Sequence, residues 1–90
     1  MKDFRIEVRV VPRKGILDPQ GKAVAGALAS LGFERLGDVH VGRLVTLELS
    51  AETEDAAHDS AVTMCRQLLA NPVTEDFEVA LAGTLEEARR

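Results

Sequence analysis

The sequence predicts an α+β domain in which a small, mostly antiparallel sheet of three long or four strands carries two helices on one face. Three observations lead to this prediction. Apolar residues alternate with polar ones near both ends of the chain, as they do in half-buried strands. Two intervening segments instead repeat their apolar residues at helical spacing. The connections between these patterns are short, and the 90 residues fit a single domain spanning residues 1–90.

The first and last patterned segments are predicted to be strands. Phe4, Ile6, Val8 and Val10 alternate with charged residues, and Pro12 ends the run because proline cannot donate a hydrogen bond to the ladder. Near the other end of the chain, the alternating residues expected to face inward are Phe77, Val79 and Leu81, followed by Gly83 as the strand's end. The remaining residues, 84–90, are expected to form a short helical or frayed tail.

A first helix is predicted to begin at Asp18-Pro19. Aspartate caps a helix by accepting a hydrogen bond from a backbone amide one turn in. Proline suits the first helical position, where its missing N–H is not needed, and Gly32 is expected to end the helix. The apolar stripe falls at i, i+3, i+4 and i+7 and consists of Val24, Ala27, Leu28 and Leu31.

The segment 36–50 has two possible structures. Its valines and leucines at odd positions keep one parity, which favours a single long strand, bent or bulged at Gly42. Alternatively, Gly42 and Arg43 form the turn of a hairpin, because glycine suits the first position of a type II′ turn. A single strand of this length would extend past so small a core, and overhanging strand edges commonly pair with another copy of the chain.

A second helix is predicted from about Glu52 to Ala70. Acidic residues crowd its first turn, where the helix dipole favours negative charge, and Asn71-Pro72 terminates it. The residues expected to face the sheet are Ala57, Ala61, Met64 and Leu68, flanked by Cys65 and Leu69.

The stretch RKGILDPQGKAV, residues 13–24, resembles a phosphate-binding loop, because basic residues and glycines precede a predicted helix. The Walker A motif requires four residues between its two glycines, whereas five residues separate Gly15 from Gly21. Ala23 occupies the position that a magnesium-binding hydroxyl would need, and the carboxylate of Asp18 stands where the anion would bind. We therefore interpret this stretch as a turn followed by a helix cap.

No catalytic, cofactor-binding or metal-binding residues are predicted. One cysteine and two histidines give no metal-ligand spacing. Cys65 falls in the middle of a helix and is expected to be buried and inert. We expect His58 to pair with Glu54 on the helix surface, and His40 to be exposed or to lie at an interface.

The composition restricts the partners and the compartment. A net charge of -4 argues against a nucleic-acid or anionic-membrane surface. No apolar run is long enough to cross a membrane, and the alternating N-terminus is not a signal peptide. A single thiol and no export signal are typical of a cytoplasmic protein. A domain of this size is only marginally stable by itself, and its single cysteine cannot form an internal disulfide. Oligomerisation is therefore the expected source of additional stability.

The residues alone leave two classes of function open. One is an accessory or assembly subunit that oligomerises and docks on an enzyme. The other is a small-molecule-binding regulatory module, because many such modules share this architecture. Fold alone cannot choose between the two.

Three motifs in order resemble the PurS family. They are KGILDPQGKAV at residues 14–24, the Val-Gly-Arg at residues 41–43, and CRQLLANPVTEDF at residues 65–77. The resemblance covers nearly the whole chain. PurS is the small subunit of phosphoribosylformylglycinamidine synthase in bacteria and archaea that divide this purine-pathway enzyme among three chains.

The resemblance implies a non-catalytic adaptor within an ATP-dependent, glutamine-hydrolysing ligase. The complete enzyme converts formylglycinamide ribonucleotide, glutamine and ATP to formylglycinamidine ribonucleotide. A glutaminase subunit releases ammonia, and a large synthetase subunit binds ATP and magnesium. The small subunit is expected to form a homodimer or a dimer of dimers, to bridge the other two subunits and to support ammonia transfer, without binding a cofactor itself.

Polar residues within these motifs are the candidates for subunit contacts. Arg43 shares the parity of its apolar neighbours, so it either reaches water at a bend or forms an ion pair in an oligomer interface. The stretch at residues 71–77 is either a plain connection or a docking loop. The full set of candidates is Arg13, Lys14, Asp18, Gln20, Lys22, Arg43, Asn71, Glu75 and Asp76.

Overall fold

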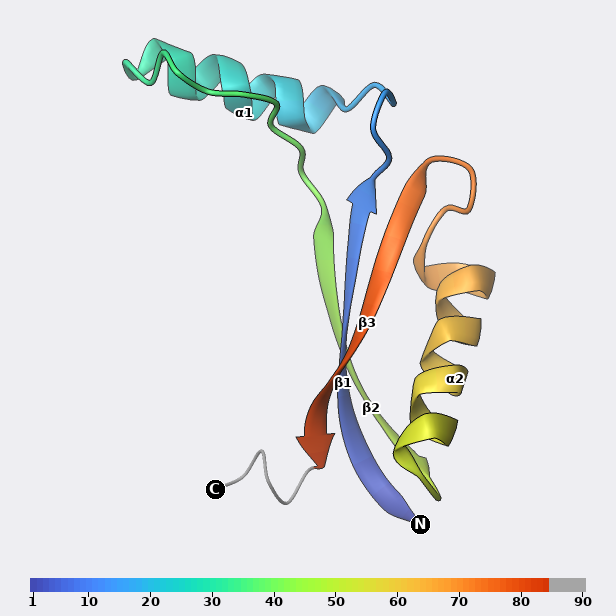
Figure 1. Cartoon of the computed structure of the whole chain (residues 1–90). Helices are drawn as coiled ribbons and strands as arrows, with labels where there is room; N and C mark the ends of the chain where they lie inside the picture. The colour runs from blue at the N-terminus through green and yellow to red at the C-terminus, as the bar shows by residue number, and fades with distance from the viewer. Residues whose placement is uncertain (85–90) are drawn as a thin grey trace.

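The computed structural model describes residues 1–84, in which three strands form one antiparallel sheet (Figure 1). Strand β1 (Lys2–Pro12) lies in the centre, between β2 (Arg43–Ala51) and β3 (Glu75–Thr84). The α+β class and the antiparallel sheet are thus confirmed. Strand β3 continues through Gly83, where we expected it to end, and the predicted tail from residue 85 onward lies outside the described residues.

The alternation along β1 produces the core of the protein. The pairing register places Val8 opposite Val45 of β2 and Val79 of β3, so apolar residues of all three strands share one face. Those of the outer strands are half-buried because each outer strand has only one neighbour. The central row is at most 1% exposed and consists of Phe4, Ile6, Val8 and Val10.

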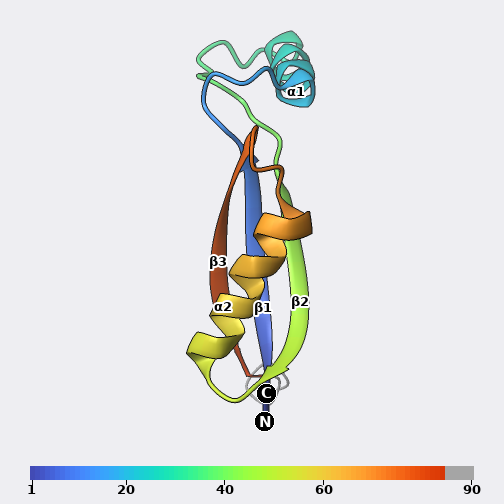
Figure 2. The same cartoon turned by 90° about the vertical axis from the view of Figure 1, so that its right-hand side faces the viewer.

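A single helical segment covers this apolar face (Figure 2). Helix α2 (Glu54–Met64) continues directly into a π-helical turn, η1 (Cys65–Leu69). Thr53 caps α2, because its hydroxyl accepts a hydrogen bond from the Ala56 amide at 3.1 Å. Small side chains let the helix approach the sheet closely, and the fully buried ones are Ala57, Ala61 and Cys65.

The π-helical turn changes which leucine faces the sheet. The Ala70 amide donates a hydrogen bond to the Cys65 carbonyl at 3.0 Å, so the turn holds one residue more than an α-helical turn. Leu69 therefore packs against the core, whereas Leu68 is 83% exposed. The prediction that Leu68 and Met64 face the sheet is wrong, because helical periodicity does not anticipate the wider turn and Met64 is left at the margin, 39% exposed.

Helix α1 (Pro19–Ser30) begins and ends where the sequence predicts. Asp18 is its N-cap and accepts a hydrogen bond from the Gly21 amide at 3.0 Å. Gly32 follows the C-cap residue with φ of 98°, a left-handed conformation that glycine adopts without strain.

Helix α1 does not lie on the sheet face that α2 covers. It extends beyond the end of the sheet in both views (Figures 1 and 2), and we call residues 13–42, which contain it, the arm. The radius of gyration is 16.7 Å, against about 12 Å for a compact chain of this length. The predicted placement of both helices on one face therefore applies to α2 alone. An apolar stripe shows that a helix has a face to bury, but it does not specify the covering surface.

The segment between α1 and β2 is neither a long strand nor a hairpin. Residues 33–42 run back alongside α1 and enter the sheet only at Arg43, opposite Val10 (Figure 1). Gly42 lies so close to β1 that an added Cβ would come within 2.3 Å of the Val10 carbonyl oxygen. Alternating valines do not form a ladder here, because no neighbouring strand extends this far.

Truncating the core row should destabilise the chain far more than the same truncation on the other face of β1. Val8 is fully buried and Val11 is 48% exposed. We expect Val8→Ala to lower the free energy of unfolding by about 2 kcal/mol, through lost burial and an unfilled cavity. Val11→Ala is the matched control and should change it by less than about 0.5 kcal/mol. Chemical denaturation measures both, and equal losses would contradict this description of the core.

Candidate functional site

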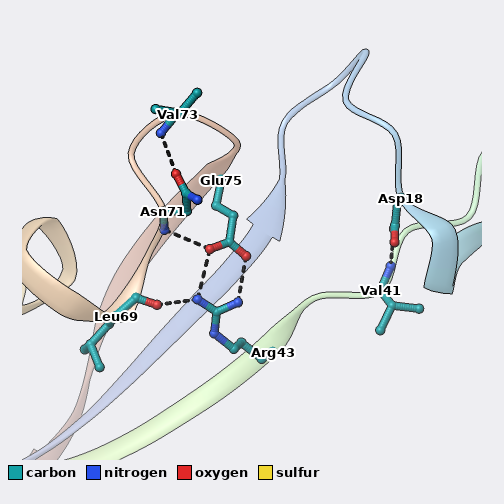
Figure 3. Close-up of polar contacts among 7 residues, drawn as sticks. All are labelled: Asp18, Val41, Arg43, Leu69, Asn71, Val73 and Glu75. Carbon is teal, nitrogen blue, oxygen red and sulfur yellow. Dashed lines mark hydrogen bonds and ion pairs between the residues drawn. The ribbon is translucent and has the colours of Figure 1, made fainter.

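The arm enters the sheet beside a cluster of hydrogen bonds centred on Arg43 (Figure 3). Its guanidinium reaches both carboxylate oxygens of Glu75, with Nη1 to Oε2 at 2.6 Å and Nη2 to Oε1 at 2.9 Å. Nη2 also donates to the Leu69 carbonyl at 2.5 Å. Three elements are therefore joined by one side chain: the start of β2, the end of η1 and the start of β3.

The loop between η1 and β3 completes this cluster. The Asn71 amide donates to Oε1 of Glu75 at 2.8 Å, and the Asn71 carbonyl accepts from the Glu75 amide at 2.9 Å. The Asn71 side chain accepts from the Val73 amide at 2.9 Å, which closes a tight turn. We call Arg43, Asn71, Glu75 and the Leu69 carbonyl the junction cluster.

The junction cluster is a mutually stabilised ion pair. The hydrogen bond from Arg43, followed by that from the Asn71 amide, lowers the pKa of Glu75 below its ordinary value. The carboxylate of Glu75 in turn raises the pKa of Arg43. The Arg43 side chain is 49% exposed and that of Glu75 17% exposed, so the pair lies at the surface with its carboxylate largely covered. Bidentate geometry of this kind fixes direction as well as distance.

A second contact ties the arm's other segment to β3. Arg13 donates from Nε to Oδ1 of Asp76 at 3.0 Å, and its backbone amide donates to the Thr74 carbonyl at 2.9 Å. Both side chains are well exposed, at 46% and 65%, so the ion pair itself contributes little to stability. The backbone hydrogen bond from Arg13 to Thr74 continues the pairing of β1 and β3 by one residue into the arm.

Within the arm, Asp18 holds two segments together. Its Oδ1 accepts from the Gly21 amide, and its Oδ2 accepts from the Val41 amide at 2.8 Å (Figure 3). These two hydrogen bonds, in that order of importance, lower the pKa of Asp18, and the nearby His40 acts in the same direction. We call Asp18 with its bonds to Gly21 and Val41 the Asp18 clamp. It joins the first turn of α1 to the segment that returns to the sheet.

Gly21 is required by the close approach of these two segments. A Cβ at this position would lie 2.2 Å from the Val39 carbonyl oxygen and 2.5 Å from Oδ2 of Asp18. Since neither neighbour can retreat without breaking the clamp, only glycine fits. A glycine near the start of a predicted helix is a signal of close packing that can be read from sequence, although it does not name the neighbour.

The structure brings most of the predicted site residues together. The junction cluster, the Asp18 clamp and the Arg13 contact engage six of the nine in contacts within this chain. Among the described residues, no side-chain hydrogen bond or ion pair holds the remaining three, which are Lys14, Gln20 and Lys22, although the Lys22 amide donates to the Asp18 carbonyl in the first turn of α1. His40, Gly21 and the Leu69 carbonyl belong to the site without having been predicted, since their roles depend on which segments become neighbours.

The site has the chemistry of a structural joint. Burial raises the pKa of Cys65, which keeps this thiol protonated within the core. The part of the chain that the structure describes holds no cluster of His, Cys, Asp or Glu suited to a metal ion. None of its helices has the length and apolar character needed to span a membrane. A shallow hollow at the joint is lined by Pro12, Ile16, Leu17, Asp18, Gln20, Val41, Gly42, Arg43, Thr74 and Glu75.

A covered sheet, a projecting arm and a polar joint between them define a small α+β interaction module. The family model for PurS, described as phosphoribosylformylglycinamidine (FGAM) synthase, matches residues 5–83. The chain is 43% identical over 76 residues to the PurS subunit of Mycobacterium leprae, covering 83% of this chain and 91% of that protein. It is 32% identical over 76 residues to that of Methanocaldococcus jannaschii, with 84% and 92% covered.

Solved structures agree with this relationship. A chain in the structure of PurLQS from Thermotoga maritima superposes with a TM-score of 0.81 at 28% identity, over 90% of this chain and 99% of that one. The crystal structure of Methanocaldococcus jannaschii PurS gives a TM-score of 0.76 at 30% identity, with 89% and 96% covered. The chain belongs to the PurS family, and the resemblance noted from its motifs is confirmed.

Neutralising Glu75 tests the junction cluster through its pH dependence. Because the pKa of Glu75 lies below its ordinary value of 4.5 in the folded chain, its stabilising effect is complete above about pH 5 and is lost as the pH falls through the lowered pKa. At pH 7 we expect Glu75→Gln to lower the thermal midpoint by about 5 °C. Towards about pH 3 the difference from the unmodified chain should become smaller, because protonation of Glu75 removes the same ion pair.

Glu78→Gln is the matched control for this measurement. Glu78 lies on the same strand, is exposed, and makes no ion pair among the described residues. Its neutralisation should leave the midpoint within about 1 °C at either pH. Equal midpoints for Glu75→Gln and the unmodified chain at pH 7 would show that the junction cluster does not stabilise the fold.

Proposed function

We propose that this chain is a non-catalytic accessory subunit that assembles through its arm. The observation that carries the proposal is the distribution of exposed apolar residues. Of the twelve large apolar side chains that are exposed in the described residues, half belong to the arm. These six are Ile16, Leu17, Val24, Leu31, Phe33 and Leu36.

The arm contains too little packing to be stable when it stands alone. A helix of twelve residues is marginal in water, and most helices depend on burying an apolar face. Leu28 is half-buried by the returning segment, but Val24 is 40% exposed and Leu31 is 74% exposed. The junction cluster and the Asp18 clamp hold this uncovered helix in one orientation. Such an arrangement supports a role in association, because the apolar stripe is presented to a partner without further ordering of the chain.

We infer that one surface covering this stripe belongs to a second copy of the chain. Two copies would each offer an arm and a body, so the contact can close as a symmetric pair, the commonest arrangement among oligomers. The body has uncovered apolar residues of its own beside the joint, at Leu68 and Val73. The homodimer predicted from the motifs is consistent with this arrangement.

The larger assembly proposed for this chain is the three-subunit ligase. The neighbouring structure named PurLQS supports the idea that the small subunit works in a complex of three kinds of chain. We propose that this chain bridges the synthetase and glutaminase subunits in the cytoplasm, and that ATP and magnesium bind to the large subunit. Lys14, Gln20 and Lys22, together with the exposed sides of Arg13 and Asp76, are then the polar residues available to other subunits.

Introducing a charge into the arm's stripe tests self-association. Val24→Glu places a carboxylate in the middle of the apolar stripe, and desolvating it would oppose association. We expect the dissociation constant of the dimer to rise at least tenfold, which is roughly the effect of changing a residue at the centre of an interface. Ala29→Glu, on the opposite side of the same helix, is the matched control and should leave association unchanged. Sedimentation equilibrium measures both, and a monomeric unmodified chain would overturn the proposed dimer.

Reconstitution of the three-chain complex tests the adaptor role. We expect Lys14→Ala and Lys22→Ala to weaken assembly and lower glutamine-dependent synthesis severalfold, while synthesis from added ammonia by the large subunit continues. Lys2→Ala, at the far end of the sheet, is the control. If assembly and glutamine-dependent activity both stay unchanged in the two variants, these residues are not subunit contacts.

A further inference from the structure

His40 is an ionisable side chain at the base of the arm, placed directly against the Asp18 clamp. Its Nδ1 lies 3.4 Å from Oδ2 of Asp18, the same oxygen that accepts the hydrogen bond from the Val41 amide. The His40 side chain is 37% exposed, whereas that of Asp18 is 9% exposed. A carboxylate that is almost covered thus faces an imidazole that is partly open to solvent.

Few other charged groups surround this contact. The hollow that contains His40 is lined on the α1 side by Asp18 and Lys22 and on its own segment by Asp38. Asp18 is the only one of the three that makes an ion-pair contact with His40 among the described residues. The charge of the imidazole therefore acts chiefly on the clamp that joins the two segments of the arm.

We propose that Asp18 and His40 form a proton-sensitive lock on the arm, in which protonation of His40 strengthens the hold of Asp18 on the returning segment. The neutral imidazole adds no charge to the two backbone donors that hold the carboxylate, even in the tautomer that carries a proton on Nδ1. The imidazolium adds a charge-assisted contact to the same oxygen, and such contacts are stronger than neutral ones.

The direction of the pH effect follows from which group titrates. The hydrogen bonds to Gly21 and Val41 keep the pKa of Asp18 below its ordinary value of 3.8, so its carboxylate stays ionised through the neutral range. Histidine side chains in general change charge between about pH 5 and 8. The lock is therefore tightest at the acidic end of that range, and it loosens as the pH rises and His40 loses its proton.

This inference rests on the proposed function in one respect, which is that a fixed arm favours association with a partner. A looser arm must be ordered upon binding, and that ordering reduces affinity. Association of the subunits would accordingly be favoured near pH 6 relative to pH 8. The lock itself is a property of the chain and can be measured without any partner subunit.

Backbone hydrogen exchange of the full chain tests the lock. The Val41 amide donates directly to Asp18, so its protection, corrected for the intrinsic exchange rate, reports the hold on the returning segment. We expect about two- to fivefold greater protection at pH 5.5 than at pH 8 in the unmodified chain, the range of a partly exposed ion pair. His40→Gln should abolish that difference. His58→Gln, which changes the other histidine, should retain it.

Asp18→Asn provides a second variant that keeps the helix cap. Asparagine is as good an N-cap as aspartate, but its amide nitrogen cannot accept the bond from Val41, and it carries no charge for His40. Protection of Val41 should fall about tenfold at every pH and no longer vary with it. The lock is overturned if protection of the Val41 amide does not vary with pH in the unmodified chain, or if His40→Gln retains the difference between the two pH values.

Parallel sedimentation measurements separate this inference from the proposed function. If the pH dependence of protection at the Val41 amide is lost in His40→Gln but Val24→Glu does not weaken association, the lock is supported and the proposal of self-assembly through the arm is wrong. If Val24→Glu weakens association but His40→Gln leaves the pH dependence of Val41 protection unchanged, the arm interface is supported and the lock is wrong. Repeating the exchange at two protein concentrations shows whether the partner copy contributes to the protection.

Discussion

The bidentate pair between Arg43 and Glu75 is the contact on which the shape of this chain depends. It stands where three elements meet, since Arg43 begins β2, Glu75 begins β3, and the guanidinium also bonds the carbonyl of Leu69, the last residue of η1. Because Arg43 is also the residue at which the arm enters the sheet, the pair fixes both the closure of α2 onto the core and the direction in which the returning segment leaves it. An Arg–carboxylate fork has a defined plane, and a single lysine could not impose one.

The chain divides into a body that satisfies its own apolar surface and an arm that does not. In the body, β1 is covered by strands on both edges and by α2 on one face, so its apolar row is completely buried. In the arm, a twelve-residue helix has only one irregular segment beside it, and its outer stripe faces water. The Asp18 clamp holds these two segments in register through the backbone amides of Gly21 and Val41, which only a proline substitution would remove as donors. A fold of this kind separates the part that confers stability from the part to which we assign association.

Much of the fold could be predicted from particular residues. The alternation of Phe4 to Val10 defined the central strand, and Asp18-Pro19 and Gly32 marked both ends of α1. The candidate site was also predicted in outline, because Arg43, Asn71, Glu75 and Asp18 were all singled out. The capping role of Asp18 was predicted as well, but its bond to Val41 and the partners of the other three residues were not, because such contacts require knowledge of which segments are neighbours. The π-helical turn at Cys65–Leu69 was missed for a related reason: an extra residue in one turn leaves no trace in a pattern that assumes 3.6 residues per turn.

By itself, the sequence determined the features that depend on local chemistry: the alternation along β1 and β3, the Asp18 cap, the Gly32 stop and the motifs of the PurS family. Only the tertiary structure decided where α1 lies, what Arg43 binds and why residue 21 must be glycine. The physical reason is that caps and periodicities act over one or two turns of chain, whereas these three features depend on contacts between segments that lie far apart in the sequence, such as Gly21 with Val39 and Arg43 with Glu75. An apolar stripe indicates that a surface is suited to be covered, but in the part of the chain that the structure describes Val24 and Leu31 of the arm stay exposed.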